Sequence, residues 1–147
     1  MRYYFRPDWI VLLISLLGTG LFVYLWIGAG SISSGSFWIA TLFTAVFLWF
    51  FSKVPLYTYV DEDIIRVRQL LSEKNFRRSQ TSVRRLTDRD MEGTIRTMGS
   101  GGLGGYIGYF NNPRLGTFYM IAVSKSNLAL LTTEEGKQYV IHFPPLQ

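Results

Sequence analysis

The stretch Gly99–Gly104 (GSGGLG) has the glycine spacing GxGxxG, which in dinucleotide-binding folds lets the backbone approach a pyrophosphate. That chemistry needs a helix that begins at the last glycine and an acidic side chain about twenty positions further on. The segment that follows, GYIGYFNNPRLG, is too rich in Gly, Asn and Pro to begin a helix, and no acid lies between Asn111 and Thr133. A P-loop is excluded because no GKS or GKT follows the glycines. The sequence therefore predicts no nucleotide site here.

The same glycines belong to a longer stretch rich in glycine and aromatic residues. We expect it to form a long hairpin whose rings pack on a β domain. Two alternatives remain open: an apolar loop that dips into a membrane interface near Lys53, and a nest of backbone N–H groups that binds an anion. The residues of this candidate site are Gly99, Gly101, Gly102, Gly104, Gly105, Tyr106, Gly108, Tyr109 and Phe110.

Residues suited to catalysis or metal binding are few. The single histidine, His142, follows Ile141 without an evident acid–base partner, so we expect a structural or surface role for it. The chain has no cysteine, which excludes a thiolate nucleophile, a disulfide and a cysteine-based metal site. The adjacent acids Asp61–Asp63 are more typical of a solvated turn than of a Ca²⁺ site, and weak Ca²⁺ contact stays open. We expect no catalytic site, no metal site and no cofactor.

Basic residues are dense from Arg66 to Arg89, where eight Lys and Arg side chains accompany two acids. Such a run can attract the headgroups of an anionic leaflet or contact a partner. The residues that we expect to make this contact are Arg77, Arg78, Arg84 and Arg85. The alternative is that alternating strands turn these side chains to water. Nucleic acid is not expected, because the aromatic residues do not interleave with the arginines.

Two apolar stretches near the N-terminus must position the basic residues and the glycine-rich stretch. Residues 9–27 (WIVLLISLLGTGLFVYLWI) carry no charge and, as a helix, match a hydrocarbon core of about 30 Å. A second stretch, residues 36–52, contains the shorter apolar run FWIATLFTAVFLWFF. All four tryptophans lie near the tips of the two stretches, where membrane-interface anchors are found: Trp9, Trp26, Trp38 and Trp49. We predict a hairpin of two transmembrane helices, with residues 1–54 as the membrane anchor.

Charges at the ends of the stretches predict the orientation. Arg2 and Arg6 precede the first stretch and Lys53 follows the second, whereas the link Gly28–Ser36 carries no charge. By the positive-inside rule, both termini are cytoplasmic. The alternative is a signal peptide cleaved near Gly28-Ala29-Gly30, although nineteen apolar residues exceed the usual signal core of about 7–15.

From Lys53 onward, short β-branched and aromatic runs alternate with turn residues every eight to twelve positions or so. This rhythm predicts an all-β domain of about seven strands over residues 55–147, a small barrel or sandwich. From the orientation predicted above, we expect this domain to be cytoplasmic. Successive antiparallel strands with tight turns are expected at Leu115–Val123, Leu128–Thr133 and Lys137–Phe143. An earlier hairpin and three weaker strands are expected at Leu56–Val60, Ile64–Leu71, Lys74–Arg78, Ser82–Leu86 and Thr94–Met98. Thr87 and Asp90 have capping-box spacing for one helical turn, which Gly93 would end.

Residues Tyr57 to Pro144 resemble the bacterial PH-domain family of membrane proteins, pleckstrin-homology-like in fold. The likeness depends on the run GSGGLGGYIGYF at Gly99–Phe110, on Leu115-Gly116 and on NLALLTTEEGKQYVIHFPP. The resemblance implies a PH-like roll of two antiparallel sheets, usually closed by a C-terminal helix, for which residues 144–147 leave no room. Either the helical hairpin or a partner is then expected to cover the open end, or the chain is a shortened variant of the family.

The resemblance also implies function and location. We expect a non-catalytic protein of the bacterial inner membrane that acts in protein interaction, oligomerisation or binding to the membrane surface. Its expected partners are the lipid bilayer, anionic lipid headgroups, and a protein partner or further copies of the chain. The alternative is an accessory or regulatory subunit of a membrane transporter or enzyme complex.

Overall fold

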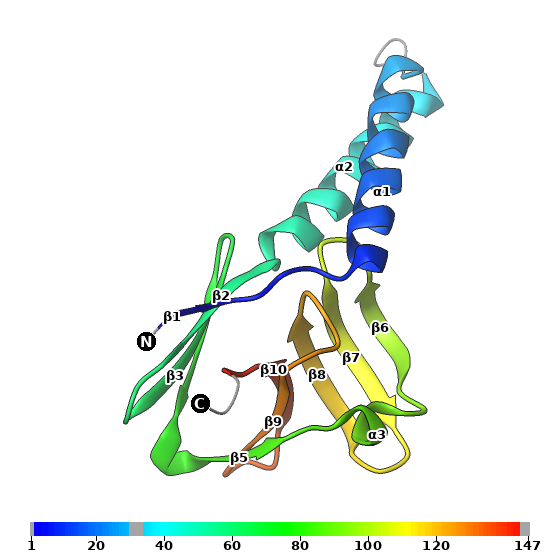
Figure 1. Ribbon diagram of the computed structural model, residues 1–147. Coiled ribbons are helices and arrows are strands. Elements are labelled where there is room, and N and C mark those ends of the chain that lie inside the picture. Colours follow the sequence, from blue (N-terminus) through cyan, green and yellow to red (C-terminus); the bar gives the residue numbers. More distant parts are fainter. Residues whose placement is uncertain (1, 30–33, 145–147) are drawn as a thin grey trace.

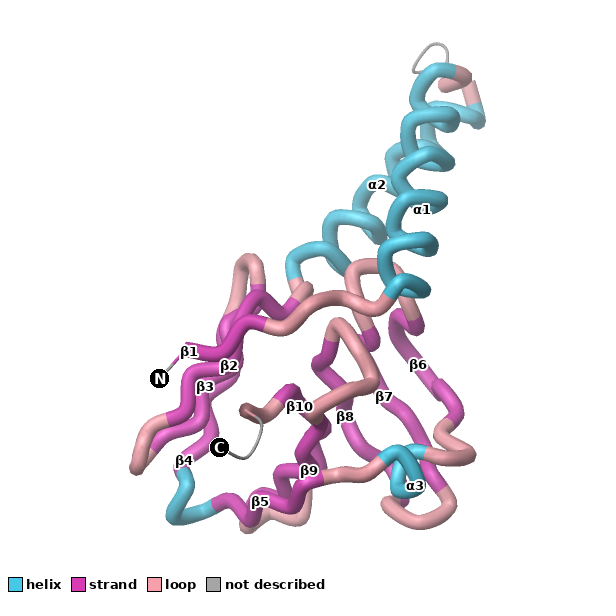
Figure 2. Tube along the Cα trace, in the orientation of Figure 1, coloured by secondary structure: helices cyan, strands magenta, loops and turns pink. Residues whose placement is uncertain are grey.

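The computed structural model describes residues 2–29 and 34–144 and shows a helical hairpin standing on a β domain (Figures 1 and 2). The hairpin consists of α1 (Trp9–Ile27) and α2 (Gly35–Ser52). The strands are β1 (Arg2–Tyr4), β2 (Pro55–Val60), β3 (Ile64–Gln69), β4 (Glu73–Arg77), β5 (Thr81–Arg85), β6 (Ile95–Gly101), β7 (Tyr106–Asn112), β8 (Gly116–Ala122), β9 (Leu128–Thr133) and β10 (Gln138–His142). A 3-10 turn (Arg78–Gln80) and the single-turn helix α3 (Asp88–Met91) lie between strands. The predicted fold class, two apolar helices before a mostly antiparallel β domain, is confirmed.

The two helices are each long and apolar enough to cross a membrane. The Ser34 side chain accepts a hydrogen bond from a backbone N–H in the first turn of α2 and so caps that helix. The helices contact each other through the stacked rings of Phe22 and Phe47, whose centroids are 5.2 Å apart. They also share a hydrogen bond of 2.8 Å from the Trp26 indole N–H to Thr44 Oγ1. Residues 30–33, which include part of the predicted link and of the predicted cleavage point, lie outside the described chain.

The first sheet has the order β1-β2-β3-β4, and its neighbouring strands are antiparallel. Strand β1 precedes α1 and pairs with β2 in the register Arg2↔Tyr59, and the sequence pattern did not predict it. The chain therefore enters the β domain, leaves it for the helical hairpin, and returns to the same sheet at Pro55.

The second sheet has the order β5-β9-β10-β8-β7-β6. The prediction of three successive antiparallel strands between residues 115 and 143 is wrong, because β10 lies between β8 and β9 and runs parallel to β8. The link from β8 to β9 must then pass over the end of β10. A tight β8–β9 turn would have put those two strands side by side, and burial of β10 on both faces outweighs that local preference.

The central strands of this second sheet are buried on both faces. On one face Ile121, Ala129 and Ile141 pack against Ile65 and Val67 of the first sheet. On the other face the buried residues form a second cluster with the start of α1: Val11, Phe110, Phe118, Met120, Leu130 and Val140. Burial on both faces explains why these strands have continuous apolar runs instead of an alternation.

The start of α1 covers this second face of the sheet. Val11 is only 3% exposed and belongs to the β-domain core. Just before the helix, the Asp8 N–H donates to the carbonyl oxygen of Val123 at 3.0 Å, and the Phe5 ring stacks on His142 at 4.2 Å. Strand β10 is the last element before Pro144, where the described chain ends. The start of α1, and not the whole helical hairpin, thus covers this face of the sheet.

Candidate functional site

The four arginines predicted as a contact patch do not lie together. Arg77 ends β4 and Arg78 begins the 3-10 turn, whereas Arg84 and Arg85 are neighbours on β5 and therefore point to opposite faces of the strand. Arg84 makes an ion pair with Asp90 at 2.7 Å, while the Arg85 guanidinium lies over the Phe143 ring at 5.3 Å. Figure 2 places the end of β4, the 3-10 turn and β5 on the part of the β domain away from the helices.

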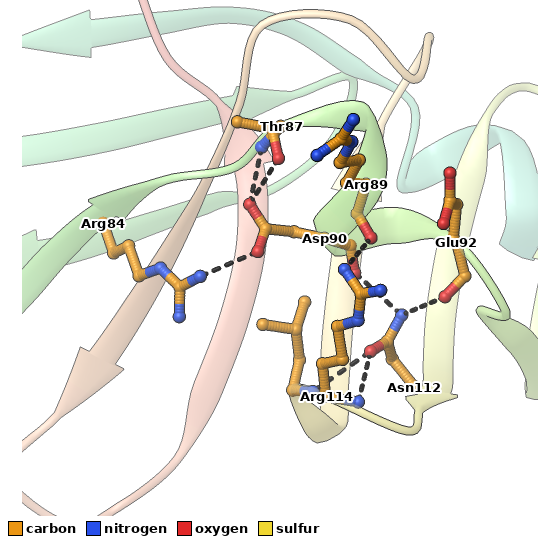
Figure 3. Close-up of polar contacts among 8 residues, drawn as sticks. Arg84, Thr87, Arg89, Asp90, Glu92, Asn112 and Arg114 are labelled. Carbon is orange, nitrogen blue, oxygen red and sulfur yellow. Dashed lines mark hydrogen bonds and ion pairs between the residues drawn. The ribbon is translucent and has the colours of Figure 1, made fainter.

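Asp90, the partner of Arg84, belongs to a capping box with Thr87. The sequence predicted this capping box, and the structure confirms it. Asp90 Oδ2 accepts hydrogen bonds from the Thr87 backbone N–H and from Thr87 Oγ1, both at 2.8 Å (Figure 3). The Thr87 backbone N–H, more than any other group, holds the pKa of Asp90 below its ordinary value. Gly93 then adopts a positive φ of 73°, and α3 ends after one turn, as expected.

Asn112 is the centre of this cluster, and the sequence analysis missed it. Its side-chain amide donates to the carbonyl oxygens of Asp90 and Glu92 and to Thr94 Oγ1, at 2.8–3.0 Å. Its Oδ1 accepts from the backbone N–H groups of Arg114 and Leu115 (Figure 3). One buried side chain thus joins α3 to the β7–β8 turn. The Asn-x-Arg-Leu order after β7 is an Asx-turn signal that could have indicated it.

The acidic turn Asp61–Asp63 has internal partners. Asp61 accepts hydrogen bonds from the Glu62 backbone N–H and from the Tyr59 hydroxyl, each at 3.0 Å. The backbone N–H is the larger of the two influences that lower the pKa of Asp61. Across residues 2–29 and 34–144, no three His, Asp or Glu side chains gather closely enough to hold a metal ion.

The glycine-rich stretch forms the β6–β7 hairpin that the sequence predicts. Tyr106 and Phe110 are buried in the core, and Tyr109 points to the opposite face and is exposed. Gly99 and Gly108 lie directly opposite each other, and a Cβ on either would overlap a backbone oxygen of the facing strand. Two glycines are therefore required where the strands approach each other most closely.

The tip of this hairpin packs against α1. Ser15 Oγ accepts a hydrogen bond from the Gly104 N–H at 2.9 Å and donates to the Gly102 carbonyl oxygen at 3.3 Å. The Leu103 side chain lies 2.7 Å from where a Cβ on Gly18 would be, so the small residue makes room for it. The Gly102 N–H donates to the Gly105 carbonyl oxygen. Since the N–H groups of Gly102 and Gly104 already have acceptors, the tip does not offer them as an anion-binding nest.

The end of α2 is held by the β3–β4 turn. The buried Gln69 side chain donates from Nε2 to the Lys53 carbonyl oxygen at 2.8 Å, and its Oε1 accepts from Ser72 Oγ. The Leu71 N–H donates to the carbonyl oxygen of Ser52, the last residue of α2, at 3.1 Å. The turn therefore satisfies carbonyl groups that a helix C-terminus leaves free.

The tryptophans are exposed along the two helices. Trp9 and Trp49 lie toward the ends that join the β domain, whereas Trp26 and Trp38 lie toward the distal end. These are the positions that the sequence predicts for two interfacial belts, and that role stays a prediction.

His142 has a structural position. It is 2% exposed, and its Nε2 accepts from the backbone N–H groups of Val123 and Ser124 at 3.0 and 3.2 Å. Because Nε2 is an acceptor, the ring proton is on Nδ1, which lies 3.1 Å from the Ser126 carbonyl oxygen. Burial lowers the pKa of His142 from 6.5 to about 4. The neutral ring thus hydrogen-bonds to the β8–β9 link, which passes over the end of β10, and holds that link in place.

A cleft of 690 Å³ opens between the start of α1 and the β6–β7 hairpin. Ile14, Phe110 and Met120 form apolar parts of its wall. Arg96, Lys125 and Glu92 also line it, and none of these three takes part in an ion pair within the described residues. With two basic side chains against one acid, this lining suits an apolar group that carries a negative charge.

Comparison with known proteins gives one match. A family model for the bacterial PH domain matches residues 56–142, from β2 to the end of β10. No curated protein and no solved structure matches the chain.

Proposed function

The chain belongs to the bacterial PH-domain family, and from this premise we propose that it is a non-catalytic, membrane-anchored binding module. Its two helices anchor the β domain in the inner membrane, and both termini lie in the cytoplasm. The β domain presents a binding surface to a protein partner or to another copy of the chain. PH-like domains are generally binding modules, and this analogy of fold supports the proposal.

The observation that carries the proposal is that α1 is shared between the β core and an apolar hairpin. Val11 is buried in the core, but only 6% of the apolar span of α1 and 11% of that of α2 are buried. Such a large exposed apolar surface is unfavourable in water and favourable in lipid. Helices that served as the core of a soluble domain would have most of this surface covered.

Membrane anchoring is tested by fractionation and reporter fusions of the full chain. We expect the protein to stay with membranes after alkaline carbonate extraction and a reporter fused after Gln147 to be active only in the cytoplasm. Release by carbonate would contradict the anchor, and a periplasmic signal from the reporter would contradict the orientation.

The arginine-bearing part of the β domain is the surface that we propose for a protein partner. Arg77 and Arg78 are exposed there, and this part lies away from the helices (Figure 1). An anionic leaflet that contacted them would have to belong to a second membrane, because the chain's own bilayer lies at the helix end. The geometry therefore favours a protein partner over the chain's own lipids.

Charge reversal separates these possibilities. We expect R77E/R78E to reduce cross-linking of the full chain to its partner in native membranes, while the matched control R66E, on the exposed face of β3, leaves it unchanged. Neutral proteoliposomes that contain the wild-type chain should not capture vesicles of phosphatidylglycerol. Capture of those vesicles that R77E/R78E abolishes would show that a second membrane is the partner instead.

The cleft beside α1 is a second surface where we propose that a partner binds. Its cationic and apolar lining predicts a segment with an acidic group next to an apolar side chain. The variant K125E should weaken cross-linking without the loss of membrane anchoring. Unchanged cross-linking by K125E would remove the cleft from the binding surface.

The alternative, an accessory subunit of a transporter or enzyme complex, differs in where the partner contacts the chain. A membrane-embedded partner would contact the helices, so cross-links would form from exposed helix positions such as Leu16 and Leu42. Purification in mild detergent followed by identification of the cross-linked site distinguishes a partner of the β domain from a membrane-embedded partner.

A further inference from the structure

Two turns of the β domain lie beside the base of the helical hairpin (Figure 1). We call them the apical turns: Leu70–Ser72 between β3 and β4, and Gly102–Gly105 between β6 and β7. Each is hydrogen-bonded to a helix, the first to the last residue of α2 and the second to Ser15 of α1. Their positions along the membrane normal are therefore tied to the positions of the helices.

The depth of the first turn follows from the length of α2. This helix has 18 residues and is about 27 Å long, so all of it is needed to cross a hydrocarbon core of about 30 Å. Ser52 then lies at the boundary of the hydrocarbon. The Leu71 backbone N–H is bonded to Ser52, and the Leu71 side chain is 77% exposed, with Leu70 45% exposed. Two exposed leucines thus lie at the level where the acyl chains begin.

The second turn lies deeper along α1. Leu103 packs beside Gly18, and a ring atom of Phe47, five residues before Ser52, lies 3.7 Å from where a Cβ on Gly18 would be. Leu103 therefore lies beside the last turns of α2, at or inside the level of Ser52. Non-helical backbone at that depth is tolerated when its polar groups have partners. Ser15 and the Gly105 carbonyl oxygen supply those partners for Gly102 and Gly104.

The composition of the turns agrees with their position. Neither apical turn contains a charged residue. The β2–β3 and β9–β10 turns, which point away from the helices in Figure 1, contain Asp61–Asp63 and Glu134–Lys137, each with three charged side chains. The β8–β9 link, which is bonded to Asp8 just before α1, carries the single charged residue Lys125. The two uncharged apical turns and the two charged opposite turns indicate a domain with a lipid-facing end and a water-facing end.

We propose that the apical turns enter the lipid leaflet next to Ser52, so that the β domain is partly embedded in the membrane instead of tethered above it. Leu70 and Leu71 insert directly among lipids, and Leu103 enters at the side of α1. This inference rests on the proposed function, because it requires α1 and α2 to span the bilayer. Lipid is the occupant of the exposed leucines because Leu71 is bonded to Ser52 at the end of α2, and the last turns of α2 also expose the apolar side chains Leu48 and Trp49.

The absence of cysteine allows a direct test by single-cysteine labelling of the full chain. An environment-sensitive fluorophore is attached to L71C and, as a matched control, to S79C, which is exposed in the 3-10 turn away from the helices. Each protein is placed as one copy per lipid nanodisc, with lipids that carry a quencher high on the acyl chain. The native tryptophans report helix insertion in the same samples with brominated lipids.

We expect the label at L71C to be quenched at least about twofold more strongly than the label at S79C, because interfacial insertion reaches about 5–10 Å below the headgroups. Equal, weak quenching at both positions while the tryptophans are quenched would overturn this inference and leave the anchor in place. Tryptophans that are not quenched would overturn the anchor and this inference together. Shielding of L71C only when two copies share a nanodisc would show that a second copy, not lipid, covers the turn, and would also overturn it.

Discussion

Acidification from pH 7 to pH 5 should destabilise the β domain through His142. The folded protein holds this ring neutral at 2% exposure, with Nε2 aimed at two backbone N–H groups, so a proton on Nε2 would face two donors and lose both hydrogen bonds. Burial accordingly lowers the folded pKa to about 4, whereas the unfolded chain titrates at 6.5. Between these two values the unfolded state binds the proton and the folded state does not.

The sign and size of the effect follow from proton linkage. The contribution of His142 to stability is present above the unfolded pKa of 6.5 and is lost as the pH falls toward the folded pKa of about 4. Between pH 7 and pH 5 the loss amounts to about 2 kcal/mol. The carboxylates with lowered pKa values, such as Asp61 and Asp90, titrate at lower pH in the folded state and so contribute little in this window.

The assay is urea unfolding of the full chain in a mild non-ionic detergent at pH 7 and pH 5, followed by near-ultraviolet circular dichroism. H142Q supplies an uncharged acceptor for the Val123 and Ser124 N–H groups, and its free energy of unfolding should change by much less than that of wild type between the two pH values. H142L leaves both N–H groups without an acceptor and should be destabilised at both pH values, by about 1–3 kcal/mol for each group.

The reasoning would be refuted if wild type and H142Q lost the same free energy of unfolding between pH 7 and pH 5. A wild-type protein whose stability did not change over this range would refute it equally. In either case the ring would have to be solvated or already charged in the folded state.

Three further predictions concern the contacts that hold the domain together. N112A removes two N–H donors, which three oxygens share, and an oxygen that accepts two hydrogen bonds, so it should cost about 2–4 kcal/mol. Amide exchange in α3 should become faster, and unchanged exchange there would contradict the role of Asn112. G108A should lower the free energy of unfolding by about 3 kcal/mol or more, because the new Cβ overlaps the facing strand. The control G20A places its Cβ in free space and should change it little. Thermal unfolding of both variants measures the difference. S15A should cost about 1–2 kcal/mol of stability and speed amide exchange in the β6–β7 turn. The control T41A loses only a hydrogen bond within α2. Equal amide exchange in the turn for the two variants would argue against the Ser15 contact.

Several features could be predicted because their causes are local. The length of an uncharged apolar run predicts α1 and α2, and the spacing of Thr87, Asp90 and Gly93 predicts the single turn of α3. The glycine-rich stretch predicts the β6–β7 hairpin, and its missing helix and acid exclude a dinucleotide site. In each case a few neighbouring residues contain the whole physical reason.

The candidate site could be predicted less well. Arg84 and Arg85 are adjacent in sequence, yet strand geometry turns them to opposite faces, and only Arg84 reaches Asp90. Ser15 looks like an ordinary small residue of an apolar helix, and its role depends on Gly102 and Gly104, nearly ninety residues away. Gln69 likewise has no local pattern that identifies it as a cap for α2.

The sequence by itself determined the two apolar helices, most of the strands, and turns with a local signal, such as the single turn of α3 and the β6–β7 hairpin. Only the tertiary structure decided that β10 lies between β8 and β9, that β1 joins the sheet of β2, and that α1 covers the core through Val11. The reason is that hydrophobic length, capping and turn preference are properties of neighbouring residues. Strand order and the closure of the domain depend instead on contacts between distant segments, which stabilise the fold only when all the elements pack together.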